Sequence, residues 1–143
     1  MVNDSRMAAA QQFFEKSFRG EVSSAIELLD EEVSYQIAGL HQAAGHFEGR
    51  EAVAQHWGAL LKLTERTLDV LQWEDWMAGS SHVAALAHMS VQRPGAILDF
   101  RTVYLIEMTE DAKIRRIEMF FDDQAAVENF FSWMGSGAEA PET

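Results

Sequence analysis

The sequence contains no cysteine, only two prolines and few basic residues. Its 143 residues carry 11 lysines and arginines against 23 aspartates and glutamates, which gives a formal net charge of −12. Without cysteine the protein forms no disulfide and has no thiolate nucleophile. A surface this acidic does not displace the counterions of nucleic acid and is repelled by anionic membranes. We therefore expect neither nucleic acid nor a membrane surface as a partner.

Long apolar segments are missing as well. No run approaches the roughly 20 apolar residues that span a bilayer, and the N-terminal stretch MVNDSRMAAA lacks the apolar core of a signal peptide. We therefore expect a cytoplasmic protein. Hydrophobic residues still make up 48% of the chain, which is enough for one domain, over residues 1–134, with a sizeable core.

The spacing of apolar residues predicts helices first and strands afterwards. A first helix is expected from near Asp4 or Ser5 to Gly20, followed by helices over SSAIELLD and REAVAQHWGALLKL and a closing helix over QAAVENFFSWM. The predicted strands are EVSYQIAG, which leads into a loop over 39–49, and then TLDVLQWEDWM, HVAALAHMSV, AILDFRTVYLIEM and KIRRIEMFF. Residues 135–143 have the composition of a disordered tail. This order favours an α+β fold in which an antiparallel sheet packs against three or four helices.

The stretch AILDFRTVYLIEM, residues 96–108, predicts which way one strand faces. Its even positions are mostly apolar, whereas Asp99 and Arg101 stand at odd positions. Alternate side chains of a strand point to opposite faces of the sheet. We therefore predict an apolar inner face and an outer face on which Asp99 and Arg101 pair with Arg116 or Glu118 of the next strand.

Three segments of the chain resemble a known family. They are FEGREAVAQHW before the strands, RPG followed by LDF, and KIRRIEMFFDDQAAVENFF near the end. Together they resemble the SnoaL-like branch of the nuclear transport factor 2-like superfamily, over roughly Phe13 to Phe131. That superfamily includes polyketide cyclases, ketosteroid isomerase, limonene epoxide hydrolase and plain binding proteins, so the resemblance bears on fold more than on chemistry. It implies a cone-shaped curved antiparallel sheet around helices, an apolar cavity, and dimerisation through the outer sheet face.

The resemblance also shows where the relatives' catalytic groups would fall. Tyr35 keeps the epoxide hydrolase's water-binding tyrosine, but that enzyme's asparagine and the isomerase's general base both fall near Ile37. The other catalytic positions fall near four residues: Ala87, Met89, Tyr104 and Met119. Apolar side chains cannot abstract a proton or activate water. We therefore expect that this chain does not run either reaction by its relatives' route.

Inside the cone we predict an apolar pocket for a small ring-containing molecule. Its predicted lining is Phe14, Phe18, Tyr35, Ile37, Trp57, Ala87, Met89, Phe100, Thr102, Tyr104, Ile117 and Met119. The phenols of Tyr35 and Tyr104 can bind a ligand oxygen, each other or a backbone carbonyl. An alternative hypothesis is an isomerase, cyclase or hydrolase in which Tyr35 and Tyr104 are catalytic and polarise a substrate oxygen.

Several other polar residues have simpler interpretations. No metal and no cofactor is expected, because the five histidines follow no ligand spacing; they are His41, His46, His56, His82 and His88. His41 and His46 lie in the predicted loop and are candidates for a pocket rim. Asp122 and Asp123 are expected to cap the last helix. A third hypothesis is a dimeric interaction module without a ligand, which uses the outer sheet residues His88, Asp99, Arg101, Val103 and Leu105.

Overall fold

The structure is a computed structural model that describes residues 2–39 and 43–132. Its helices are α1 (Val2–Phe18), α2 (Val22–Ala25), the 3-10 helix η1 (Ile26–Leu28), α3 (Arg50–Leu63) and α4 (Gln124–Ser132). Its strands are β1 (Leu29–Ile37), β2 (Gly45–Glu48), β3 (Asp69–Ala78), β4 (His82–Arg93), β5 (Ala96–Met108) and β6 (Ile114–Phe121). The predictions for His41 and for the tail 135–143 lie outside the described residues.

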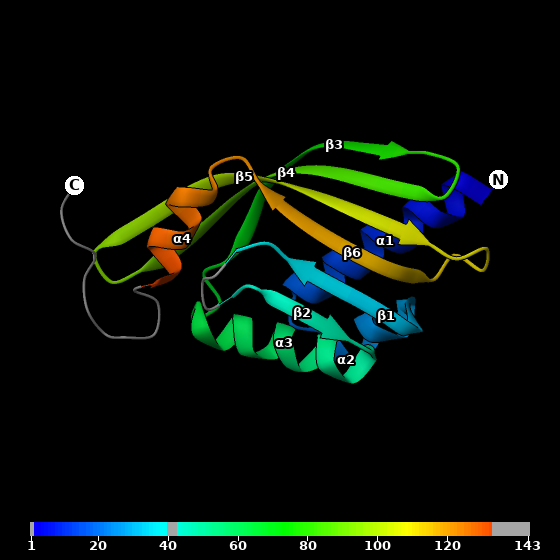
Figure 1. The fold of residues 1–143 in the computed structure, drawn as a ribbon, viewed down its shortest axis with the longest axis horizontal. Coiled ribbons are helices and arrows are strands. Elements are labelled where there is room, and N and C mark those ends of the chain that lie inside the picture. The colour runs from blue at the N-terminus through cyan, green and yellow to red at the C-terminus, as the bar shows by residue number, and fades with distance from the viewer. Residues whose placement is uncertain (1, 40–42, 133–143) are drawn as a thin grey trace.

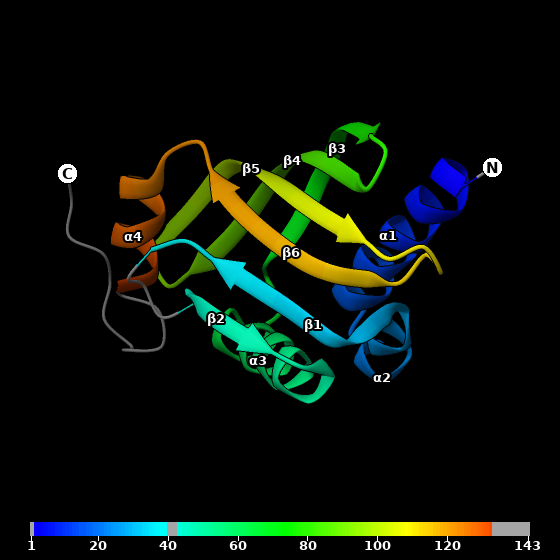
Figure 2. The same ribbon diagram turned by 45° about the vertical axis from the view of Figure 1, so that its right-hand side comes forward.

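All six strands form one curved sheet in the order β2-β1-β6-β5-β4-β3. Figures 1 and 2 show this sheet curving around α1, with α3 beside β2 and α4 at the end of the molecule away from the N-terminus. The predicted α+β cone is therefore confirmed. The core lies between the inner sheet face and the helices, where α1 packs on β3 and β4 and α3 packs on β1 and β2.

The sheet is mixed, whereas a fully antiparallel one was expected. β1 runs parallel to β6, while the other four neighbouring pairs are antiparallel. The turns between β3 and β6 are short and force antiparallel pairing, but nothing local sets the direction of β1 against β6, which lie far apart in the sequence. The short strand β2 was also not predicted; it lies within the expected loop and pairs with β1 from Ser34↔Glu48 to Ile37↔Gly45.

Other predicted elements agree closely with the structure. α3 and β5 have the predicted bounds, whereas α1 already begins at Val2, and SSAIELLD divides into parts of α2, η1 and β1. The last helix is capped by one aspartate of the expected pair: the backbone N–H of Ala126 donates to Asp123 Oδ1 at 3.0 Å. Asp122 Oδ1 accepts instead from the backbone N–H of Arg101, at 3.1 Å.

The predicted facing of β5 is confirmed. From Phe100 to Met108 its even positions are buried, and Asp99, Arg101 and Val103 are exposed on the outer face. The predicted pairing of Arg101 was wrong, because its guanidinium binds Glu74 of β3, with Nε at 2.8 Å from Oε2 and Nη2 at 3.1 Å from Oε1. Glu74 lies at a bulge in β3, between Trp73 and Asp75, and its carboxylate reaches Arg101 across the sheet.

Candidate functional site

Two buried phenols lie on the inner face of the sheet. Tyr35 comes from β1 and Tyr104 from β5, with exposed fractions of 0% and 1%. The Tyr104 hydroxyl donates to the sulfur of Met89 at 3.7 Å. The Tyr35 hydroxyl has no hydrogen-bond partner among the described residues. A buried hydroxyl without a partner costs about 1–3 kcal/mol, which makes Tyr35 a candidate donor to a ligand.

Burial keeps both phenols protonated. It raises the pKa of Tyr35 above its ordinary value, because the phenolate loses its hydration inside the core. Burial also raises the pKa of Tyr104, and the neighbouring Tyr35 phenol raises it further. At neutral pH these groups can therefore donate a hydrogen bond, but they cannot act as bases.

His56 of α3 is a third buried polar group, and the sequence analysis did not single it out. Its ring stacks on Phe47 with centroids 4.0 Å apart and meets Tyr35 edge-on at 5.8 Å. Nε2 has no hydrogen-bond partner among the described residues, and burial lowers the pKa of His56 to about 4. The sequence nevertheless indicates that His56 is buried, because it stands three residues after Val53 and four before Leu60, on the apolar stripe of α3.

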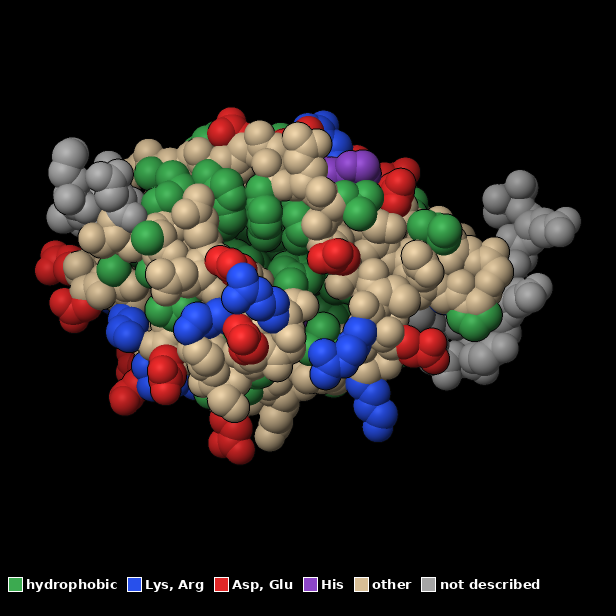
Figure 3. Space-filling view, turned by 180° about the vertical axis from the view of Figure 1, so that it is seen from behind, with side chains coloured by type: hydrophobic (Ala, Val, Ile, Leu, Met, Phe, Trp, Pro, Cys, Tyr) green, Lys and Arg blue, Asp and Glu red, His purple; other side chains and the backbone are tan. Residues whose placement is uncertain are grey.

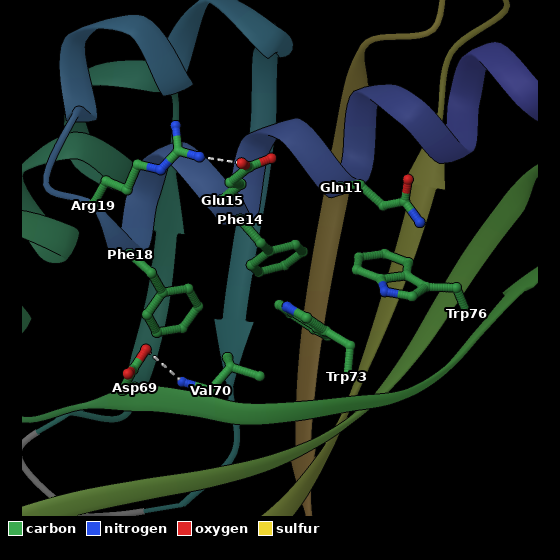
Figure 4. A pocket seen from close by; sticks show the side chains of 9 residues that line it. All are labelled: Gln11, Phe14, Glu15, Phe18, Arg19, Asp69, Val70, Trp73 and Trp76. Atoms are coloured by element: carbon green, nitrogen blue, oxygen red, sulfur yellow. Dashed lines mark hydrogen bonds and ion pairs between the residues drawn. The ribbon is translucent and has the colours of Figure 1, made fainter.

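A hollow of about 470 Å³ lies between α1 and β3, and we call it the α1–β3 groove. Figure 4 shows the side chains that line it: Gln11, Phe14, Glu15, Phe18, Arg19, Asp69, Val70, Trp73 and Trp76. In the space-filling view from behind, hydrophobic side chains gather at the centre of this face, with acidic and basic side chains in front of them (Figure 3). Five of the nine lining residues are apolar and four are polar or charged, so the hollow combines apolar surface with groups that can orient a ligand.

Three aromatic rings form the floor of the α1–β3 groove. Trp73 and Trp76 of β3 have ring centroids 4.8 Å apart, and Phe14 of α1 lies 5.6 Å from Trp73 and 6.4 Å from Trp76. The ring of Phe14 also lies 4.4 Å from that of Tyr104. The floor of the groove therefore separates bound solvent or ligand from the buried phenols.

A β-bulge brings both tryptophans into the α1–β3 groove. Strict alternation along β3 would send Trp73 and Trp76 to opposite faces of the sheet. The register shifts between Trp73 and Asp75, so that Trp73 pairs with Ala87 and Trp76 with Ala85, on the same face. Sequence reasoning missed both residues as site candidates, because a bulge cannot be read from the alternation of apolar and polar residues. Two tryptophans three residues apart within a predicted strand were the feature that could have indicated it.

The charges at the rim of the α1–β3 groove are only partly paired. The guanidinium of Arg19 binds the Glu15 carboxylate and lies 3.9 Å from Glu21. Asp69 accepts a hydrogen bond on Oδ1 from the backbone N–H of Val70 at 2.9 Å. Among the described residues, it has no ion-pair partner. The rim therefore carries one unpaired carboxylate.

The structure divides the predicted pocket residues between three places. Phe14 and Phe18 line the α1–β3 groove. Three others line an apolar cavity of about 20 Å³ near α4: Ile37, Phe100 and Met119. The remaining seven are buried in the core: Tyr35, Trp57, Ala87, Met89, Thr102, Tyr104 and Ile117.

Two of these core side chains already have backbone partners. The Trp57 indole N–H donates to the carbonyl of Ser17 at 2.7 Å, and Thr102 Oγ1 donates to that of Phe120 at 2.7 Å. Neither polar group is free for a ligand unless that bond breaks. Tyr35 therefore differs from Trp57 and Thr102 in that its polar atom has no partner in the described structure.

In the part of the chain that the structure describes, no three His, Asp or Glu side chains come together as metal ligands. None of the helices there has the length and apolarity needed to cross a membrane. His46 lies on β2, exposed, 3.5 Å from Glu48, and does not reach the α1–β3 groove.

Comparison with known proteins identifies the family. A family model described as SnoaL-like domain matches residues 10–117. No curated protein matches the chain by sequence. Bal32a from a soil-derived mobile gene cassette is similar in structure, with a TM-score of 0.85 and 20% identity over 92% of this chain and 99% of its own.

Two further solved structures share the fold. A Xanthomonas campestris protein with a cystatin-like fold has a TM-score of 0.80 at 23% identity, covering 88% of this chain and 97% of its own. SalBIII is an epoxide hydrolase/cyclase-like enzyme in pyran ring formation of the polyether salinomycin. Its TM-score is 0.69 at 18% identity, and the match covers 85% of this chain and 94% of SalBIII. On the family match, this chain belongs to the SnoaL-like domain family.

Proposed function

We propose that the protein binds a small ring-containing molecule in the α1–β3 groove. The observation that carries this proposal is the aromatic floor made by Phe14, Trp73 and Trp76. The volume of about 470 Å³ falls within the range of roughly 300–1,000 Å³ typical of small-molecule sites. The rings of this floor are tilted by 39° to 56° to one another, so a flat ligand ring can stack on one of them and meet another at an angle.

Tryptophan signals test this proposal directly. The chain has four tryptophans, so a ¹⁵N-labelled sample has four indole N–H signals, which single Trp→Phe variants assign. Titration with 2-naphthalenemethanol is expected to shift the signals of Trp73 and Trp76. Trp76→Ala should weaken binding about fivefold or more, since one stacked ring contributes on the order of 1 kcal/mol or more. Leu71→Ala is the matched control, because Leu71 is exposed on the same strand outside the groove. If neither this neutral probe nor its positively and negatively charged analogues change the signals of the two tryptophans, the proposal is refuted.

An enzymatic function is the second candidate, and the unpartnered Tyr35 hydroxyl favours it. In an isomerase, cyclase or hydrolase, Tyr35 and Tyr104 would donate hydrogen bonds to a substrate oxygen that becomes negative in the transition state. Their raised pKa values suit donors of this kind. SalBIII, which shares the fold, is an epoxide hydrolase/cyclase-like enzyme and so belongs to this class.

Turnover measurements decide between binding and catalysis. Removing one such donor lowers kcat by about 10²–10³ in comparable sites. We expect that loss for Tyr35→Phe with cyclic epoxides or ring-closing substrates, with substrate binding retained. Thr102→Val is the control, because it also removes a buried hydroxyl but one that already bonds the backbone. Equal turnover in the two variants would reject a catalytic role for Tyr35.

We also propose that the protein forms a homodimer through the outer sheet face. Val103 and Phe120 are cross-strand neighbours there, 37% and 45% exposed, and Leu105 lies half-buried on the same face. Leu105→Asp should shift the sedimentation coefficient from dimer to monomer. Ile97→Asp is the control, since it charges an exposed apolar residue near the turn at the start of β5. A wild-type chain that sediments as a monomer at every concentration would refute the dimer.

A further inference from the structure

The rim charges narrow the chemical class of the ligand. We infer that the α1–β3 groove binds a ring-containing ligand that carries a positive charge, such as a protonated amine next to an aromatic ring. This inference rests on the proposed function, because it concerns the same groove. It depends on the unequal pairing of the three charged side chains at the rim: Glu15, Arg19 and Asp69.

The carboxylate of Asp69 is the group that would bind the cation. Asp69 is the first residue of β3, and its Oδ1 accepts from the Val70 N–H at 2.9 Å. That bond fixes the carboxylate at the groove. Figure 4 shows it beneath the ring of Phe18, across from the Glu15–Arg19 pair. Among the described residues Oδ2 has no hydrogen-bond or ion-pair partner, so it can accept from an ammonium group.

The one cation at the rim does not offer an equivalent site for an anion. The guanidinium of Arg19 already binds the Glu15 carboxylate and has Glu21 at 3.9 Å. An anionic ligand would have to displace an acidic side chain that belongs to the protein. The summed charge of Glu15, Arg19 and Asp69 is −1, so the rim as a whole attracts cations.

The aromatic floor and the charge of the whole chain favour the same ligand. Indole and phenyl faces attract cations through the negative potential above the ring, and Trp does so most strongly. Trp73 and Trp76 line the same groove as Asp69, four and seven residues further along β3, and Trp73 is the nearer ring (Figure 4). A formal net charge of −12 also raises the rate at which cations reach the protein.

Three naphthalene probes that differ mainly in charge test the inference. They are naphthalen-2-ylmethylammonium, 2-naphthalenemethanol and 2-naphthoate, each titrated at low salt with the indole signals of Trp73 and Trp76 as the readout. We expect the ammonium to bind about three- to tenfold more tightly than the alcohol, and the naphthoate more weakly than either. Added sodium chloride should reduce this difference, because the rim is open to solvent.

Matched variants test whether the Asp69 carboxylate produces the preference for the ammonium probe. Asp69→Asn should bring the Kd of the ammonium to that of the alcohol and leave the alcohol unchanged. Asp75→Asn removes the same charge from the same strand. Asp75 pairs with Leu86 of β4 and therefore lies on the outer sheet face, away from the groove. This variant should keep most of the preference for the ammonium. Arg19→Gln should increase the preference, because it frees the Glu15 carboxylate.

The outcomes separate this inference from the proposed function. If the alcohol shifts both tryptophan signals and the three probes bind equally, the groove binds ligands but the cation preference is wrong. A preference that survives Asp69→Asn, or falls equally in Asp75→Asn, would overturn the role of Asp69. If none of the three probes shifts Trp73 or Trp76, the proposed function itself is refuted.

Discussion

The buried imidazole of His56 should make the stability of the protein depend on pH. Burial lowers the pKa of His56 in the folded protein to about 4, against 6.5 for an imidazole in an unfolded chain. Between these values the unfolded chain binds a proton that the folded protein does not. The free energy of unfolding must therefore fall as the pH falls through this window. Above about pH 6.5 the full contribution is present, and below about pH 4 it is lost.

The size of this effect follows from the two pKa values. Each pKa unit corresponds to about 1.4 kcal/mol, so the difference between 6.5 and about 4 amounts to about 3 kcal/mol. That is a large part of the roughly 5–15 kcal/mol that stabilises a typical domain. The rings that contact His56 belong to Phe47 and Tyr35, and neither carries a charge in this pH range. No nearby side chain among these contacts offsets the loss.

Urea unfolding between pH 4 and pH 7 measures the effect. We compare the wild-type protein with His56→Gln, which cannot titrate, and with His82→Gln as the control, because His82 is exposed. Wild type and His82→Gln should lose about 3 kcal/mol more than His56→Gln on acidification. Parallel curves for wild type and His56→Gln would refute the reasoning, since they would mean that His56 binds its proton equally in both states.

Two further predictions concern buried polar groups. Tyr35→Phe removes a hydroxyl without a partner and should raise the free energy of unfolding by about 1 kcal/mol, whereas Thr102→Val breaks a bond to the backbone and should lower it by a similar amount. Urea unfolding at pH 7 measures both changes, and a destabilised Tyr35→Phe would contradict the first. Arg93→Met removes the 2.8 Å hydrogen bond from Nη1 to the carbonyl of Phe130 and the guanidinium 4.5 Å above its ring. Hydrogen exchange should then become faster in α4, and unchanged protection there would contradict this.

Sequence reasoning worked where local periodicity controls the structure. The alternation in β5 correctly predicted that Asp99 and Arg101 lie outside, because shifting a strand by one residue would bury both charges. α3 was predicted with its bounds, because Val53, Trp57 and Leu60 share one helical face. In both elements a burial pattern that spans several turns or pleats allows only one orientation.

The rest depended on contacts between distant parts of the chain. The direction of β1 against β6 and the pairing of β2 with β1 are set by the assembled sheet. Arg101 binds Glu74, a residue of a strand that is not adjacent to β5 in the sheet and is 27 residues away in the sequence. The bulge in β3 creates the floor of the α1–β3 groove, since it places Trp73 and Trp76 on one face. The aromatic floor of the groove therefore lies where the regular alternation of side chains along β3 is broken.

The position of Phe14 bears on both proposed functions and favours binding over catalysis. Its ring forms part of the groove floor with Trp73 and lies 4.4 Å from Tyr104 on its other side. A ligand can stack on Trp73 and Trp76 without moving any buried side chain. The rings of Phe14 and Trp73 both lie against Tyr104, with centroids 4.4 and 6.2 Å from its ring, so a substrate oxygen can reach the phenol hydroxyls from this groove only after one of these rings moves. Binding in the groove requires no such rearrangement, whereas catalysis by the phenols through this groove does, and for this reason we place binding first.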